Sequence, residues 1–87
     1  MIHKKKTWPS KFEEVLLGKK QFEARLANEN YQVGDTIILE EWNPETKTYT
    51  GRTITKKITY VLKTKEMPQY WPKEEVEKYG LAILSLK

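Results

Sequence analysis

The chain has 87 residues, a net charge of +4, no cysteine and one histidine, His3. This length suits one domain over residues 1–87 with one modest core, and the missing cysteines exclude disulfides and thiolate metal sites. No apolar run approaches the roughly 20 residues that span a bilayer, and the first residues lack the apolar stretch of a signal peptide. We therefore expect a cytoplasmic protein without membrane contact, metal or cofactor.

The charge lies in blocks along the chain. Residues 1–25 carry a net +4, residues 26–50 a net −4, and residues 51–66 a net +4. Two basic blocks around an acidic one can assemble a basic face, which suits a polyanionic partner such as nucleic acid. Many lysine-rich domains have a similar charge without such a partner, and the acidic block would also suit a protein-interaction adaptor.

The first predicted elements are a strand over residues 2–7 and a short helix over residues 9–17. Pro9 suits the first helical turn, where its missing N–H has no partner to lose. Gly18 is placed to end the helix in the left-handed conformation. Trp8 is expected to pack on the helix. Three apolar side chains follow the spacing of a buried helical stripe: Phe12, Val15 and Leu16.

The alternation of residues 21–26 predicts a second strand with one apolar and one polar face. The apolar face, expected to point into the core, holds Phe22, Ala24 and Leu26. The polar face, expected to point outward, holds Gln21, Glu23 and Arg25.

A long hairpin is predicted next, with strands over residues 36–42 and 52–63 joined by a turn-rich link. Lys56 interrupts the apolar alternation of the second of these strands, which suggests either a bulge or a lysine that reaches outward past the sheet edge. Residues 71–80 predict a second short helix and residues 81–87 a buried final strand. Whether residues 63–72 form a lid is left open.

The predicted order is strand, helix, three strands, helix, strand. Five short strands and two short helices around one core predict a small α+β fold, a closed or half-closed β-barrel with helices at its rim. Aromatic side chains in the predicted loops would offer platforms for a planar ligand: Tyr31, Trp42, Tyr49, Tyr70 and Trp71. For Trp42, a place in the core and a stacking role both stay open.

The stretch "GKKQFEAR" contains a recognisable motif. Gly18, Lys20, Glu23 and Arg25 match G-x-K-x-x-E-x-R, and on these residues the chain resembles the ASCH domain of the PUA-like superfamily. The similarity continues through "YQVGDTIILEEWNPETKTYTGR" and "ITYVL" to a small ASCH-like family of uncharacterised bacterial and phage proteins. It covers most of residues 3–62.

The resemblance implies a PUA-like β-barrel whose cleft lies between the first helix, the motif strand and neighbouring loops. It also implies RNA, another nucleic acid or a modified nucleoside as the ligand. In the family a run of the type K-N-D-R follows the motif arginine, whereas this chain has "LANE" over residues 26–29. This departure predicts a less charged cleft.

The candidate ligand-binding residues are Lys6, Lys20, Glu23, Arg25, Tyr31, Trp42 and Arg52. Lys20 is either a cation at a helix C-terminus, worth about 0.3–1 kcal/mol, or a pocket residue. Glu23 and Arg25 are either an exposed ion pair, worth about 0–1 kcal/mol, or cleft residues. In a cleft, Arg25 could grip a phosphate with two N–H groups, and Glu23 could orient both cations or accept the amine of a base. His3 is expected to be merely exposed.

Three functions follow from these residues. The first is a monomeric module that binds RNA or a nucleoside through Lys20, Arg25 and Arg52, with a base stacked on Tyr31 or Trp42. The second is a small hydrolase, because some ASCH relatives remove the acyl group of an N4-acylated cytidine with a lysine, a threonine and a glutamate. Lys20 matches that lysine, but Glu23 stands at the threonine position and would have to act as a general base while Lys20 stabilises the oxyanion. The third is the protein-interaction adaptor.

Overall fold

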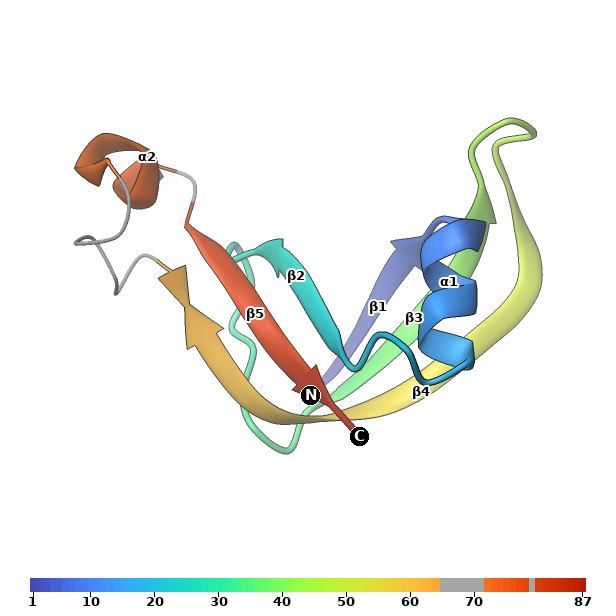
Figure 1. Ribbon diagram of the computed structural model, residues 1–87, viewed down its shortest axis with the longest axis horizontal. Coiled ribbons are helices and arrows are strands. Elements are labelled where there is room, and N and C mark those ends of the chain that lie inside the picture. The colour runs from blue at the N-terminus through green and yellow to red at the C-terminus, as the bar shows by residue number, and fades with distance from the viewer. Residues whose placement is uncertain (65–71, 79) are drawn as a thin grey trace.

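A computed structural model describes residues 1–64, 72–78 and 80–87, apart from the side chains of Val76 and Leu81. The elements are β1 (Ile2–Thr7), α1 (Pro9–Leu16), β2 (Phe22–Leu26), β3 (Thr36–Asn43), β4 (Thr48–Lys63), α2 (Lys73–Lys78) and β5 (Leu81–Leu86). This order confirms the predicted one (Figure 1). The aromatic platforms expected at Tyr70 and Trp71, and most of the lid considered over residues 63–72, lie outside the described residues.

All five strands join one mixed sheet in the order β1-β3-β4-β5-β2. β1 runs parallel to β3, and the other neighbours are antiparallel. β4 is 16 residues long and pairs first with β3 and then with β5, so it passes through both halves of the sheet. The sheet curls into a half-barrel in which the two edge strands, β1 and β2, face each other (Figure 1).

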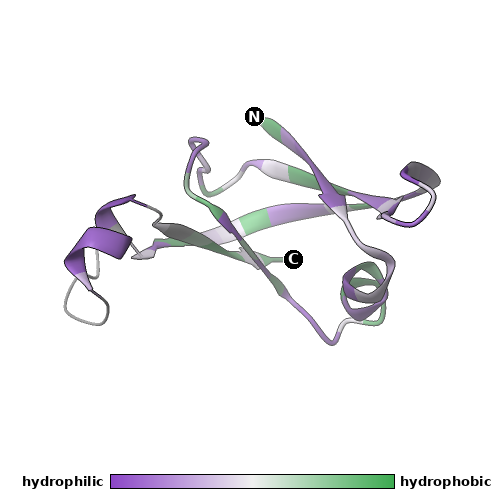
Figure 2. Cartoon of the chain, turned by 90° about the horizontal axis from the view of Figure 1, so that it is seen from above, coloured by the Kyte–Doolittle hydropathy of each residue, from purple (hydrophilic) through white to green (hydrophobic). Residues whose placement is uncertain are grey.

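The core lies inside the curl and draws on α1, β3, β4, β5 and the loop between β2 and β3. Its fully or nearly buried members are Val15, Tyr31, Ile37, Leu39, Ile58, Ala82, Leu84 and Leu86. β3 and β5 supply alternate residues to it, as period-2 strands with one buried face do. Figure 2 shows this mixture of apolar and polar residues along the strands, with the strongly hydrophilic α2 at one end of the molecule.

Helix α1 begins at the predicted residue and ends at Leu16, one residue before the predicted end. Pro9 occupies the first turn, and Gly18 has φ 75, the left-handed conformation that stops a helix. Phe12 and Val15 are buried, but Leu16, the third member of the predicted stripe, is 52% exposed. The helix contacts the sheet mainly along β3, and a stripe of two side chains is enough for such a narrow contact.

The predicted faces of β2 are wrong. Glu23 is buried with 2% of its surface exposed, whereas Phe22 and Leu26 are 48% and 52% exposed. In the pairing with β5, Glu23 lies opposite the buried Leu84, so both side chains point inward. The polar face can turn inward because Glu23 is neutralised there by two cations.

The irregularity of β4 lies further along the strand than Lys56 suggests. Its pairing with β5 shifts between Ile58 and Tyr60, and Tyr60 is 61% exposed as a result. A second shift, in β3 between Glu40 and Trp42, falls in the β3–β4 hairpin. Among the described residues, no helix is long and apolar enough to cross a membrane.

The reversed face of β2 gives a direct test of the fold. Leu84→Ala removes a side chain with 0% exposure and is expected to lower the free energy of unfolding by about 2–5 kcal/mol. Leu26→Ala, on the neighbouring strand but half exposed, is expected to cost about 1 kcal/mol or less. Urea denaturation of both variants measures the difference, and equal losses would contradict the orientation of β2.

Candidate functional site

The two edge strands of the half-barrel are connected by side chains. β1 and β2 are not neighbours in the hydrogen-bonded sheet. Arg25 on β2 reaches across, and its Nη2 donates to the backbone carbonyl of Lys6 at 3.1 Å and to Thr7 Oγ1 at 3.4 Å. This seam is where the sheet fails to close into a barrel.

A buried carboxylate with two cations lies at the seam. Lys20 Nζ donates to Glu23 Oε1 at 3.1 Å, and Arg25 Nε donates to Glu23 Oε2 at 2.9 Å. The backbone of Lys20 is itself fixed, since its N–H donates to the carbonyl of Glu14 at the end of α1. Charge-assisted hydrogen bonds of this kind are roughly twice as strong as neutral ones. Glu23 therefore orients both cations.

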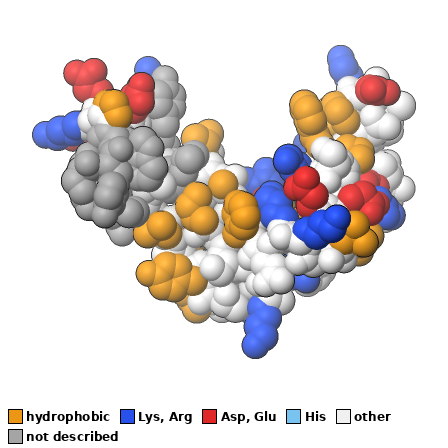
Figure 3. Space-filling view, in the orientation of Figure 1, with side chains coloured by type: hydrophobic (Ala, Val, Ile, Leu, Met, Phe, Trp, Pro, Cys, Tyr) orange, Lys and Arg blue, Asp and Glu red, His pale blue; other side chains and the backbone are white. Residues whose placement is uncertain are grey.

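A hollow of about 310 Å³ opens beside these three side chains. Its lining comes from the end of β1, the start of α1, the segment between α1 and β2, and β2 itself: Lys6, Thr7, Trp8, Ser10, Lys11, Lys20, Glu23, Ala24 and Arg25. Ligand sites usually measure about 300–1,000 Å³, so this hollow suits a small planar molecule. Figure 3 shows basic and acidic side chains gathered at the base of the notch between the two arms of the half-barrel.

The structure brings four of the seven candidate residues to the hollow. Lys20, Glu23 and Arg25 lie there together, as the motif suggests. Lys6 lines it beside them, but its ammonium lies 4.5 Å from the centre of the Trp42 ring. Its backbone carbonyl, which accepts from Arg25, is therefore its link to the site. Trp42 is half-buried beneath that ammonium and does not line the hollow.

Arg52 lies away from the hollow and fastens α1 to the hairpin. Its Nε and Nη2 donate to Glu41 at 2.9 and 2.8 Å, and Nη2 also donates to Glu13 on the helix. The guanidinium lies 4.8 Å from the centre of the Phe12 ring. Hydrogen bonds from Arg52 and then from Thr50 lower the pKa of Glu41 from 4.5 to about 2. Arg52 has a structural task in this arrangement.

Tyr31 and His3 are both buried, contrary to expectation. Tyr31 has 1% and His3 3% of its surface exposed, and their ring centres lie 4.7 Å apart. The aromatic platform predicted at Tyr31 is therefore wrong, because the loop after β2 folds back over the core. A loop position alone could not reveal this, since loop aromatics in sequence look alike whether they fold inward or outward.

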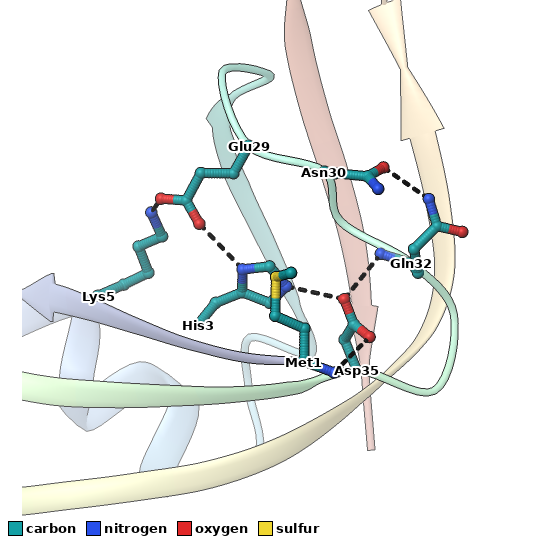
Figure 4. A network of polar contacts seen from close by, with 7 residues as sticks. All are labelled: Met1, His3, Lys5, Glu29, Asn30, Gln32 and Asp35. Atoms are coloured by element: carbon teal, nitrogen blue, oxygen red, sulfur yellow. Dashed lines mark hydrogen bonds and ion pairs between the residues drawn. The ribbon is translucent and has the colours of Figure 1, made fainter.

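His3 is buried because it is held between two carboxylates (Figure 4). Its Nδ1 lies 2.9 Å from Glu29 and its Nε2 lies 2.8 Å from Asp35. The contact with His3, followed by that with the Met1 amine, lowers the pKa of Asp35 from 3.8 to about 2. Lys5 also donates to Glu29. The network joins β1 to the loop that precedes β3.

The segment "LANE", which departs from the family's K-N-D-R run, supplies one of the two carboxylates that contact His3. Ion pairs with Lys5 and then with His3 hold the pKa of Glu29 below its ordinary value. Glu29 therefore serves the His3 network, and residues 26–29 do not line the hollow. Within residues 1–64, 72–78 and 80–87, no group of three or more His, Asp or Glu side chains is arranged to hold a metal ion.

Sequence reasoning missed five residues that complete the lining: Thr7, Trp8, Ser10, Lys11 and Ala24. Trp8 is 59% exposed, more open than the expected packing on the helix implies. The one indication in the sequence was the position of these residues. Thr7 to Lys11 run from the end of β1 into α1, and this segment lies beside the motif strand. That adjacency depends on the curl of the sheet, which no local pattern encodes.

Comparison with known proteins identifies the family. Residues 2–76 match the family model described as "Domain of unknown function (DUF3850)". The chain belongs to this family. The description of the family names no activity and does not mention the ASCH domain.

A phage protein and a solved structure are also similar to this DUF3850 chain. The "Uncharacterized 12.9 kDa protein in GpA 3'region" of Escherichia phage P2 is 43% identical over 60 residues, which are 69% of this chain and 53% of that protein. The chain thus matches about half the length of this relative. The crystal structure of hypothetical protein PH0355 superposes with a TM-score of 0.67 over 100% of this chain and 98% of that one, at 20% identity. This likeness shows a shared fold.

The low pKa values of Asp35 and Glu41 predict acid sensitivity. Both carboxyls bind protons more weakly in the folded chain than in the unfolded one, with folded pKa values of about 2 against 3.8 and 4.5. The unfolded state therefore takes up protons first as the pH falls, and the stabilisation present above about pH 5 is lost toward pH 2. The free energy of unfolding, measured in urea at each pH, should decline across this window.

Glu41→Gln isolates one part of this effect. The variant should be less stable than the parent at pH 7 and should show a shallower decline between pH 5 and 2. Glu45→Gln, at an exposed position of the hairpin turn, serves as the charge control and should keep the parent profile. Parallel profiles for the parent and Glu41→Gln would contradict the assigned contact with Arg52.

Glu23→Gln tests the buried carboxylate at the seam. The amide keeps the shape but removes the charge that both cations share, so the free energy of unfolding should fall by about 1–3 kcal/mol. Glu40→Gln, on a half-buried side chain of β3 outside the hollow, is the matched control. A Glu23→Gln variant as stable as Glu40→Gln would show that the two cations do not depend on Glu23.

Proposed function

We propose that this protein binds RNA, another nucleic acid or a nucleoside in the hollow between β1, α1 and β2. The observation that supports this most is the buried Glu23, held between Lys20 and Arg25 at the base of a hollow of about 310 Å³. The half-barrel is compatible with the PUA-like β-barrel that we propose for this chain. One copy of the chain supplies every lining residue, so the proposal requires only a monomer.

The charges of the hollow favour a ligand that carries both an anion and N–H donors. Its lining includes the charged groups of Lys11, Lys20 and Arg25 against the single carboxylate of Glu23. The ammonium of Lys6 lies over the Trp42 ring instead. An ionised carboxylate offers about four lone-pair positions, and the two cations use only part of them. Glu23 can therefore accept an N–H from the edge of a base while the surrounding cations attract phosphate, and a nucleotide provides both groups.

Trp8 supplies the stacking surface that the sequence assigned elsewhere. It lines the hollow and is 59% exposed, so one face of the indole is open to a planar ligand. Stacking of a base on an aromatic side chain is worth about 1–3 kcal/mol. Trp8 replaces Tyr31 in the proposed site, because Tyr31 is buried in the core.

The contacts of Arg25 change its proposed role. Its Nε is used by Glu23 and its Nη2 by the end of β1, so the edge that would grip a phosphate in two places is occupied. Arg25 shapes the hollow by holding β1 and β2 at a fixed distance. Phosphate contacts then fall to Lys20 and Lys11, which are compact point charges on flexible stems.

The same contacts weigh against the hydrolase alternative. Both oxygens of Glu23 accept hydrogen bonds from cations, and a proton taken from water would neutralise the charge that holds both cations in place. Purified protein incubated with N4-acetylcytidine is therefore expected to release no acetate. Release that disappears in Lys20→Ala would favour the hydrolase.

Binding is tested with labelled single-stranded RNA in a fluorescence titration at low and moderate salt. The parent should bind, with affinity that falls as salt rises because phosphate contacts release counterions. Lys20→Ala/Arg25→Ala should weaken binding at least tenfold, an effect of about 1.4 kcal/mol. The control Lys4→Ala/Lys57→Ala removes the same charge from two exposed positions outside the hollow.

Trp8→Ala gives a second readout that does not disturb the buried ion pairs. It should weaken RNA binding while the circular dichroism spectrum and the urea midpoint stay near those of the parent. Equal affinities of the parent, the Lys20/Arg25 variant and Trp8→Ala would overturn the proposal, as would equal losses in the Lys4/Lys57 control.

A further inference from the structure

A second hollow of about 330 Å³ lies on the other side of Lys20. It is lined by Lys11, Glu14, Lys19, Lys20 and Phe22. Lys11 and Lys20 line both hollows, so the two spaces adjoin across these cations. Their sizes are nearly equal.

Phe22 gives the second hollow an aromatic platform. It is 48% exposed on the outer face of β2, an edge strand, and the ammonium of Lys20 lies 5.5 Å from the centre of its ring. A large aromatic side chain left open on a soluble surface beside several cations is a typical stacking position for single-stranded nucleic acid.

The cations between the hollows are free enough to meet a phosphate. Lys11 pairs with Glu14 at 3.6 Å, and both side chains are largely exposed, at 60% and 44%. Such pairs are weak and rearrange readily. Lys20 keeps one contact with Glu23, and an ammonium has three donors, so further N–H groups can reach a ligand.

The end of α1 does not oppose an anion here as strongly as a bare helix C-terminus would. The carbonyls of its last turns accept from the N–H groups of Leu17, Gly18, Lys19 and Lys20. Capping of this kind satisfies the carbonyls that carry the negative end of the helix dipole. Lys19 and Lys20 add positive charge at the same place.

We propose that the second hollow takes the nucleotide next to the one in the first, so that the ligand is a single strand of at least two nucleotides. This inference rests on the proposed function. In a nucleic-acid strand one phosphate separates neighbouring bases, and here one pair of cations, Lys11 and Lys20, separates two base-sized hollows, each with an exposed aromatic ring. Trp8 stacks one base and Phe22 the next.

The test compares ligands of increasing length by isothermal titration and fluorescence: adenosine, the dinucleotide ApA and the decamer rA10, with uridine, UpU and rU10 as the second series. The dinucleotide and decamer should bind at least tenfold more tightly than the nucleoside. Phe22→Ala should remove most of this gain, about tenfold, in keeping with one lost stacking contact. Phe22→Trp should retain the gain.

Leu26→Ala is the matched control for Phe22→Ala. Leu26 lies on the same strand and has a similar exposure, 52% against 48%, but it lines neither hollow. If nucleosides bind but longer ligands gain nothing, or if Phe22→Ala and Leu26→Ala behave alike, the second nucleotide position is overturned and the first hollow stands. If neither nucleosides nor strands bind, or if Lys20→Ala/Arg25→Ala binds as the parent does, both proposals fail.

Discussion

The structure depends on a carboxylate that is buried where its sheet remains open. Glu23 receives Lys20 from the segment after α1 and Arg25 from its own strand, and Arg25 continues to the end of β1. Three segments that share no backbone ladder at this point are thus held by one charge. Because an unpaired buried charge is strongly unfavourable, the two cations and the carboxylate require one another, and the hollow beside them keeps its shape without a ligand.

Two further clusters of charged side chains have separate tasks. Arg52 joins the helix to the hairpin through Glu13 and Glu41, and His3 joins β1 to the segment after β2 through Glu29 and Asp35. In a chain this small the apolar core contacts only part of each element. These clusters hold α1, β1 and the connecting segments in place where the core does not reach them. The carboxylates of these two clusters pair with cations that lie away from Lys20 and Arg25.

The sequence predicts the elements and their order well because local residues mark where an element begins or ends, such as Pro9 in the first turn of α1 and Gly18 after its last. The sequence predicts the wrong buried face for β2. Alternation alone cannot say which face meets the core when the polar face holds a carboxylate together with cations that pair with it. For the site, the motif brings Lys20, Glu23 and Arg25 together. Tyr31 and Trp8 exchange their expected environments, because their burial follows from how the sheet curls over long range.

Strand β4 sets how far apart the two arms of the half-barrel stand. β4 pairs with both halves of the sheet and changes register between Ile58 and Tyr60, and shifts of this kind bend a strand and increase its twist. The angle at that bend fixes how far apart the two arms stand, and hence how wide the mouth between β1 and β2 opens. The register shift therefore sets the width of this opening, although Ile58 and Tyr60 line neither hollow.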